Sequence, residues 1–150
     1  MSLYEPHLRQ FITRTLMDFA PHYASLPAIE ILLMTAAAES DFGTYLYQKK
    51  GPAKGLFQIE PDTHNSIHAN YFNRRWPMFR KKDHDALVYD LKYQVIVARG
   101  IYANKTEVLP SEKNIEGMAL YHKKHWNTYL GDADPVNTVK KYLRFVKGVK

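Results

Sequence analysis

Apolar residues recur at helical spacing in the first part of the chain, and Ala20-Pro21 ends the pattern. This spacing predicts an amphipathic helix over residues 5–19, which we interpret as scaffold. The residues near the i, i+3 and i+4 positions are Leu8, Phe11, Ile12, Leu16 and Phe19.

The next segment is apolar almost all round. Residues 28–38 contain one charged residue, Glu30, and Pro27 suits the first turn of a helix. Because a helix that is apolar on every side is buried, we expect this to be the central helix of the fold. It ends near Gly43, which can take the left-handed conformation of a C-terminal cap.

The rest of the chain reads as a loop followed by further helices. Turn signals lie between residues 43 and 58, where Tyr45-Leu46-Tyr47 suits a short strand. Further helices are predicted over residues 61–72, 84–103 and 136–149, and another begins at an N-cap, Ser111, and holds Ile115, Met118, Ala119 and Tyr121. We therefore predict a single mainly α domain over residues 1–150, with a small β-hairpin or loop element.

Composition narrows the class of protein. With 150 residues, of which 45% are hydrophobic, the chain can build one sizeable core, and the absence of cysteine excludes disulfides and thiolate chemistry. The longest apolar run is too short to cross a bilayer, and no secretory signal is visible at the N-terminus, so we expect no membrane insertion. A formal charge of +6 favours a polyanionic partner: nucleic acid, an anionic membrane surface or an acidic glycan.

Glu39 is the first candidate for chemistry. A carboxylate at the end of an apolar helix is partly buried, which favours its protonated form, as a general acid near neutral pH requires. The alternative is a helix-terminal Glu exposed to water.

Four segments resemble the lytic transglycosylase family of the lysozyme-like superfamily, most closely its small bacteriophage versions. Residues 39–42, Glu-Ser-Asp-Phe, resemble the family's Glu-Ser-x-Phe, and residues 51–63 resemble its Gly-Ala-x-Gly-Leu-Met-Gln-Ile-x-Pro-x-Thr. Residues 119–122 occupy the place of its Ala-Tyr-Asn-Ala-Gly motif, and residues 138–146 resemble its closing Thr-x-x-Tyr-x-x-x-Val helix.

The resemblance implies a lysozyme-like fold and cleavage of the β-1,4 bond between N-acetylmuramic acid and N-acetylglucosamine in bacterial peptidoglycan. Glu39 then protonates the glycosidic oxygen and afterwards acts as base, while the muramic C6 hydroxyl attacks C1 and gives a 1,6-anhydro product. Neither a second carboxylate nor a cofactor is required. We expect such a protein to be a monomer that is made in the cytoplasm of a bacterial host and acts in the periplasm or cell wall after release, or is carried in a virion.

The same resemblance implies substrate-binding roles for Ser40, Phe57, Gln58, Glu60 and Tyr121. The amide of Gln58 can both donate to and accept from a sugar acetamide. Phe57 replaces the family's Met as an apolar groove surface, and the Tyr121 hydroxyl is expected close to the catalytic carboxylate. For Gln58 the alternative is a loop-tethering side chain, and for Tyr121 it is a core aromatic.

Other patterns leave alternatives open. Asp41, Glu60 or Asp62 can orient a water, which would make the protein a hydrolytic muramidase. The segment Arg74–Lys82 interleaves aromatics with positive charge, so a non-catalytic basic module that binds cell wall or, less favourably, nucleic acid is the rival from another class.

The histidines offer weaker candidates. His64 and His68 stand at i, i+4 spacing, but the Glu of a His-Glu-x-x-His motif and a third ligand are missing, so we predict no metal site. The segment His122-Lys123-Lys124 replaces the family's Asn-Ala-Gly and should add positive charge near the cleft. We interpret His122 and His125 as part of a solvated basic face.

Overall fold

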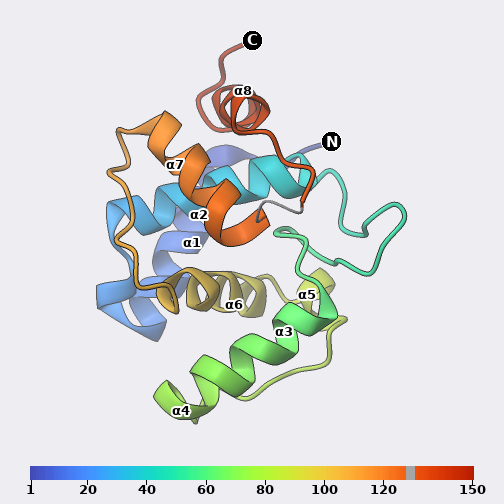
Figure 1. Cartoon of the computed structure of the whole chain (residues 1–150), viewed down its shortest axis with the longest axis vertical. Helices are drawn as coiled ribbons and strands as arrows, with labels where there is room; N and C mark the ends of the chain where they lie inside the picture. Colours follow the sequence, from blue (N-terminus) through green and yellow to red (C-terminus); the bar gives the residue numbers. More distant parts are fainter. Residues whose placement is uncertain (128–130) are drawn as a thin grey trace.

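The computed structural model describes residues 1–127 and 131–150, and the mainly α class is confirmed. The α-helices are α1 (Glu5–Phe19), α2 (Leu26–Ser40), α3 (Pro61–Ile67), α4 (Asn73–Arg75), α5 (Ala86–Tyr89), α6 (Leu91–Ala103), α7 (Ile115–His122) and α8 (Pro135–Phe145). A 3-10 turn, η1 (Pro21–Tyr23), follows α1, while the π-helical segments η2 (His68–Phe72) and η3 (Lys123–Asn127) continue α3 and α7. In Figure 1, α2 runs through the middle of the assembly, with α8 on one side and α6 on the other.

The central position of α2 follows from its composition. Residues 28–37 are all buried, and α2 contacts α1, α6, α7 and α8. Ser25 accepts a hydrogen bond from the Ala28 N–H at 3.3 Å and thereby caps the helix, whose first turn contains Pro27. Each large aliphatic side chain buried here stabilises the fold by about 1.5–3 kcal/mol.

One acid lies within the apolar part of α2 and is paired there. Glu30 is 6% exposed, and Arg9 of α1 donates to its two carboxylate oxygens at 2.6 and 3.0 Å. The Tyr142 hydroxyl of α8 donates to the same carboxylate. Burial would raise the pKa of Glu30, but these hydrogen bonds outweigh it and hold the pKa below its ordinary value. The charged group therefore joins α1, α2 and α8.

A left-handed turn ends α2. Asp41, Phe42 and Gly43 have φ values of 47°, 58° and 83°, so the predicted left-handed Gly43 is confirmed, although the turn begins two residues earlier, at Asp41. Phe42 is fully buried, and its ring stacks on that of Phe145 at 6.2 Å between centroids. This anchor compensates for the unfavourable backbone conformation of a bulky residue.

Three predicted helix boundaries are wrong. Residues 84–103 are divided at Asp90, which adopts an extended conformation and caps α6 by accepting from the Tyr93 N–H at 3.0 Å. Asn114, rather than Ser111, caps α7, since its side chain accepts from the Gly117 N–H at 2.9 Å. The last helix ends at Phe145 and not near residue 149.

The element between α2 and α3 is a loop. Among the described residues no strand forms, and the loop has only isolated antiparallel bridges, Tyr47 with Lys54 and Lys54 with Ile59. The loop alternative therefore describes this element, and the hairpin is not found. Nor does any helix of residues 1–127 and 131–150 have the length and apolar character needed to span a membrane.

Candidate active site

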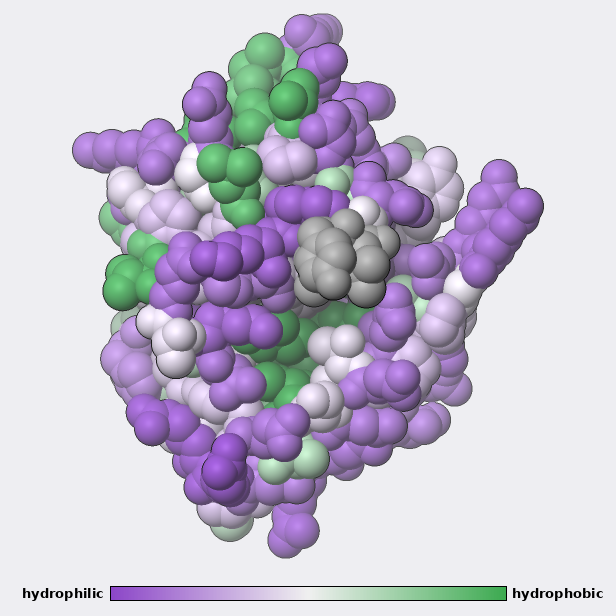
Figure 2. All heavy atoms as spheres, viewed as in Figure 1, coloured by the Kyte–Doolittle hydropathy of each residue, from purple (hydrophilic) through white to green (hydrophobic). Residues whose placement is uncertain are grey.

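A cleft of about 870 Å³ lies where α2, the loop, α3 and the start of α8 meet. Figure 2 shows this face hollowed, with apolar atoms at the bottom of the hollow. Apolar lining comes from Ala38, Ile59, Ile67 and Ile101, together with Trp126. The polar lining is rich in amides and hydroxyls: Gln48, Gln58, Asn104, Asn127, Asn137, Thr63, Ser66 and Thr138.

Glu39 reaches this cleft from the last turn of α2. Its side chain is 16% exposed, so the partial burial expected from the sequence is confirmed and the fully exposed alternative is wrong. Thr35, Ala36 and Ala37 of the preceding turn are buried, so Glu39 follows a buried part of the helix. Glu39 therefore combines access to the cleft with shielding from bulk water.

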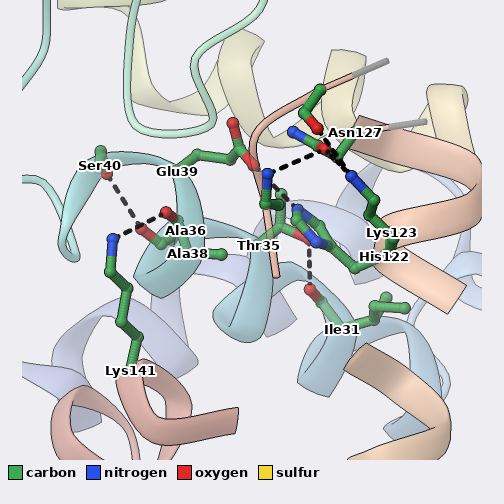
Figure 3. Close-up of polar contacts among 12 residues, drawn as sticks. Ile31, Thr35, Ala36, Ala38, Glu39, Ser40, His122, Lys123, Asn127 and Lys141 are labelled. Carbon is green, nitrogen blue, oxygen red and sulfur yellow. Dashed lines mark hydrogen bonds and ion pairs between the residues drawn. The ribbon is translucent and has the colours of Figure 1, made fainter. Parts of the chain in front are cut away.

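His122 holds the Glu39 carboxylate. The His122 Nε2 lies 3.0 Å from Oε2 of Glu39, and the imidazole is completely buried. Figure 3 shows the Glu39 side chain directed toward the ring, which comes from the end of α7. When Glu39 is ionised, Nε2 must carry the hydrogen and donate to it. The interpretation of His122 as part of a solvated basic face is wrong.

A buried tyrosine lies close to this pair. The Tyr102 hydroxyl is 2.7 Å from Oγ1 of Thr35, one turn before Glu39 on α2. Burial raises the pKa of Tyr102 well above its ordinary value; the hydrogen bond with Thr35 opposes that shift, and the nearby charge of Glu39 adds to it. Tyr102 is therefore neutral at physiological pH and does not compete as an acid.

Two further predicted residues line the cleft. Gln58 adopts a φ of 50° and donates from its side-chain nitrogen to the Gly55 carbonyl at 2.9 Å. It thus tethers the loop and also lines the cleft, while its contact with a sugar acetamide stays a prediction. Glu60 is exposed just before α3, and Asp62 follows in the first turn of that helix on the same wall.

The structure contradicts three predicted substrate contacts. Ser40 is 1% exposed, and its hydroxyl oxygen lies 2.6 Å from the Leu56 carbonyl oxygen, so it joins α2 to the loop. Phe57 is 1% exposed and packs inward instead of forming a groove surface. The Tyr121 hydroxyl donates to the Glu107 carbonyl at 2.8 Å, away from the cleft lining, which supports the core-aromatic alternative.

The charge of the cleft is opposite to that of the whole chain. Among the described residues, its lining contains two lysines, Lys105 and Lys141, and five carboxylates, Glu39, Glu60, Asp62, Asp132 and Asp134. The expected addition of positive charge from residues 123–124 holds in part, because Lys123 hydrogen-bonds two residues of the cleft lining, whereas the charge of Lys124 is paired. Lys123 donates to the Asn127 side chain and the Gly131 carbonyl at 2.9 and 2.8 Å, and Lys124 pairs with Glu107.

Helical spacing contains a signal for His122 that the prediction missed. His122 follows Ile115, Met118 and Ala119 at i+7, i+4 and i+3, so all four lie on one face of α7. Met118 and Ala119 are buried, and His122 is buried with them. The family motif instead indicated Tyr121, the residue directly before His122 in the sequence.

His64 and His68 belong to the core. Both are 1% exposed, and their Nε2 atoms lie 2.6 and 2.9 Å from the Tyr93 hydroxyl. Burial lowers the pKa of each histidine to about 4; the charge of Lys81 adds to this at both, and His68 and His84 add to it at His64. No group of three possible metal ligands occurs in the described ranges.

The basic segment 74–82 is less available for binding than its sequence indicates. The Trp76 Nε1–H donates to the Tyr23 hydroxyl at 3.0 Å, and the Phe79 ring lies 4.6 Å from that of Phe72. Because both aromatic residues pack against the core, they are not free platforms on which nucleotide bases can stack.

Comparison with known proteins adds no family assignment. No family model, curated protein or solved structure matches the chain. The lysozyme-like identification accordingly stays a prediction that rests on the sequence motifs, alongside the geometry of Glu39.

Proposed function

We propose that the protein cleaves the β-1,4 bond between N-acetylmuramic acid and N-acetylglucosamine in bacterial peptidoglycan, with Glu39 as general acid and base. The observation that carries this proposal is the shielded Glu39 carboxylate, 16% exposed at the wall of a cleft of about 870 Å³. Amide and hydroxyl side chains around it suit the hydroxyl and acetamide groups of a glycan.

The proposed reaction uses one carboxyl group twice. Glu39 gives its proton to the glycosidic oxygen as the bond from C1 to that oxygen breaks. The carboxylate then takes the proton of the muramic C6 hydroxyl, whose oxygen forms the new bond to C1. Both atoms and charge balance, because Glu39 ends the cycle protonated and no water is consumed.

Hydrolysis is the second candidate, and one observation favours it. Glu60 and Asp62 line the same cleft as Glu39 and are exposed, so either can orient a water toward C1. Asp41, the third acid considered from the sequence, is less suited because its Oδ1 lies 2.9 Å from Nζ of Lys141.

Mass spectrometry of the fragments released from purified sacculi tests the proposal. We expect soluble muropeptides that end in a 1,6-anhydro group and are lighter than hydrolytic products by the mass of one water. Reducing-end products that disappear in Glu60→Gln or Asp62→Asn would replace transglycosylation by hydrolysis. A protein that sediments with the wall and releases no muropeptide would be a binding module instead.

A further inference from the structure

We propose that His122, as a neutral imidazole protonated on Nε2, is a positioning residue that reserves Oε2 of Glu39 as an acceptor, so that the catalytic proton is carried by Oε1. This inference deepens the proposed function and rests on it for its role in the reaction. The placement of the proton on His122, however, can be tested without any substrate.

The first step is the geometry of the pair. Nε2 of His122 lies 3.0 Å from Oε2 of Glu39, and Figure 3 shows the two side chains meeting between α2 and α7. The imidazole is completely buried, whereas Glu39 keeps 16% of its side chain exposed toward the cleft. One oxygen of Glu39 is thus engaged by the protein, and the carboxyl group still has access to the substrate.

The second step concerns the other ring nitrogen. Nδ1 of His122 is buried and has no hydrogen-bond partner in the part of the chain that the structure describes. An N–H at this position would be a buried donor without an acceptor, which is costly, and more so on a charged ring. Both the imidazolium and the Nδ1–H tautomer are therefore disfavoured, and the neutral Nε2–H tautomer remains.

The third step locates the shared proton. A carboxylate beside an imidazolium and a carboxylic acid beside a neutral imidazole contain the same number of protons. Because a hydrogen on the buried, unpartnered Nδ1 is unfavourable, the second arrangement is preferred, and whenever the pair holds this proton it lies on Glu39. Since Oε2 accepts from Nε2–H, that proton lies on Oε1, from which it can reach the glycosidic oxygen.

The same hydrogen bond serves both halves of the proposed cycle. When Oε1 has given its proton to the leaving oxygen, Nε2–H donates to a carboxylate, and the hydrogen bond becomes charge-assisted and stronger. Oε1 then takes the proton from the C6 hydroxyl. His122 keeps its own proton throughout and is not a donor to the substrate.

Several charged and titratable groups on the surrounding elements are engaged with other partners. They include Glu30 of α2, Asp41 just after α2, Tyr102 of α6, Tyr121 of α7, Lys123 and His125 of η3, and Lys141 and Tyr142 of α8. Asp41 pairs with Lys141, Glu30 holds Tyr142, and Tyr102 bonds to Thr35. On the α7 side, Lys123 bonds to Asn127, and Tyr121 and His125 bond to Glu107.

Nitrogen-15 NMR of the histidine side chains in the full chain tests the inference directly. At pH 7 we expect the His122 resonances of a neutral ring with its hydrogen on Nε2. Resonances of an imidazolium or of the Nδ1–H tautomer would overturn it. This readout needs no substrate, so its failure is distinguishable from failure of the proposed peptidoglycan cleavage.

Two variants of His122 add a kinetic test. His122→Gln retains a neutral N–H donor, so kcat should fall by no more than about fivefold. His122→Phe removes the donor; kcat should fall about 10–100-fold, the scale of other outer-shell partners, with KM little changed.

Equal loss in the Gln and Phe variants, or wild-type kinetics in the Phe variant, would contradict the inference. Thermal unfolding of each variant identifies a change that merely disrupts the fold. If neither variant folds, the NMR experiment on the wild-type chain decides.

Discussion

The hydroxyl oxygen of Ser40 lies 2.6 Å from the carbonyl oxygen of Leu56, so the residue after Glu39 is joined directly to the loop that carries Gln58. The same hydroxyl accepts from the Gly43 N–H at 2.9 Å. These contacts hold the end of α2 against the loop. Ser40, for which the family resemblance implied substrate binding, therefore has a structural role.

Ser40→Ala should therefore reduce both stability and activity. Loss of the hydroxyl leaves the buried Leu56 carbonyl and the half-buried Gly43 N–H without this partner, which should lower the free energy of unfolding by about 1–3 kcal/mol. Activity should fall mainly in kcat, because the loop moves relative to Glu39. Urea unfolding and muropeptide release measure the two effects, with Ser2→Ala, an exposed serine, as the matched control. Equal unfolding midpoints for the two variants would contradict the structural role.

Gly55→Ala should destabilise the fold more than Gly148→Ala, the same change at another left-handed glycine. Gly55 has a φ of 90°, and a Cβ there would lie 1.8 Å from the Leu87 carbonyl oxygen, whereas Gly148, with a φ of 70°, has nothing within 4 Å. Gly148→Ala should cost only the backbone strain of about 1–2 kcal/mol. Gly55→Ala should add a steric cost of about 1–3 kcal/mol, measured by urea unfolding of both variants. Similar losses at the two positions would argue against a close approach of the loop to α5.

Sequence periodicity predicted the parts of the fold that depend on local pattern. The apolar run 28–38 identified α2 as the central helix, and its last residues identified Glu39 and Gly43. The division at Asp90 was missed because the periodicity of the apolar residues continues across it. At Gly55 the loop closely approaches the Leu87 carbonyl, a long-range contact that no local pattern contains.

The site was predicted less completely than the fold. Glu39 and Gln58 were identified from motifs. His122 was missed because the family motif implies a role for its neighbour, Tyr121. Which of the two faces the end of α2 depends on how α7 packs against α2 and α8. The overall charge of +6 was equally uninformative about the cleft, because charge is distributed by the three-dimensional fold.

Arg9→Met tests the buried ion pair that joins α1 to α2. The change leaves the Glu30 carboxylate, which is 6% exposed, without its closest cation and should lower the free energy of unfolding by about 3–5 kcal/mol. The double variant Arg9→Met/Glu30→Met should recover part of this loss, because it removes the unpaired charge as well. Urea unfolding of the single and double variants provides the measurement, and a double variant less stable than Arg9→Met would contradict the account.

The histidine pair should make the fold sensitive to mild acid. Burial lowers the pKa of His64 and His68 from 6.5 to about 4, so the unfolded chain binds more protons than the folded chain between these values. Stability contributed by neutral histidines is fully present above pH 6.5 and is lost as the pH falls toward 4, by at most about 3 kcal/mol per histidine.

Unfolding in urea at several pH values between 7 and 4 measures this dependence. His64→Gln/His68→Gln should lose stability at pH 7 but show a shallower decline toward pH 4, since the titrating groups are gone. His7→Gln, a change at an exposed histidine of α1, should leave the pH dependence of the free energy of unfolding as in the wild type. If the free energy of unfolding of the double variant declined with pH as steeply as that of the wild type, other groups would cause the acid sensitivity.

The rate at which Glu39→Gln releases soluble muropeptides from purified sacculi tests the central claim most directly. Removal of the general acid should reduce this rate by about 10²–10⁴-fold, with an unfolding curve close to that of the wild type. Glu116→Gln, the same chemical change at an exposed position in the first turn of α7, should release muropeptides at the wild-type rate. A folded Glu39→Gln variant that releases them as fast as the wild type would contradict the assignment of Glu39.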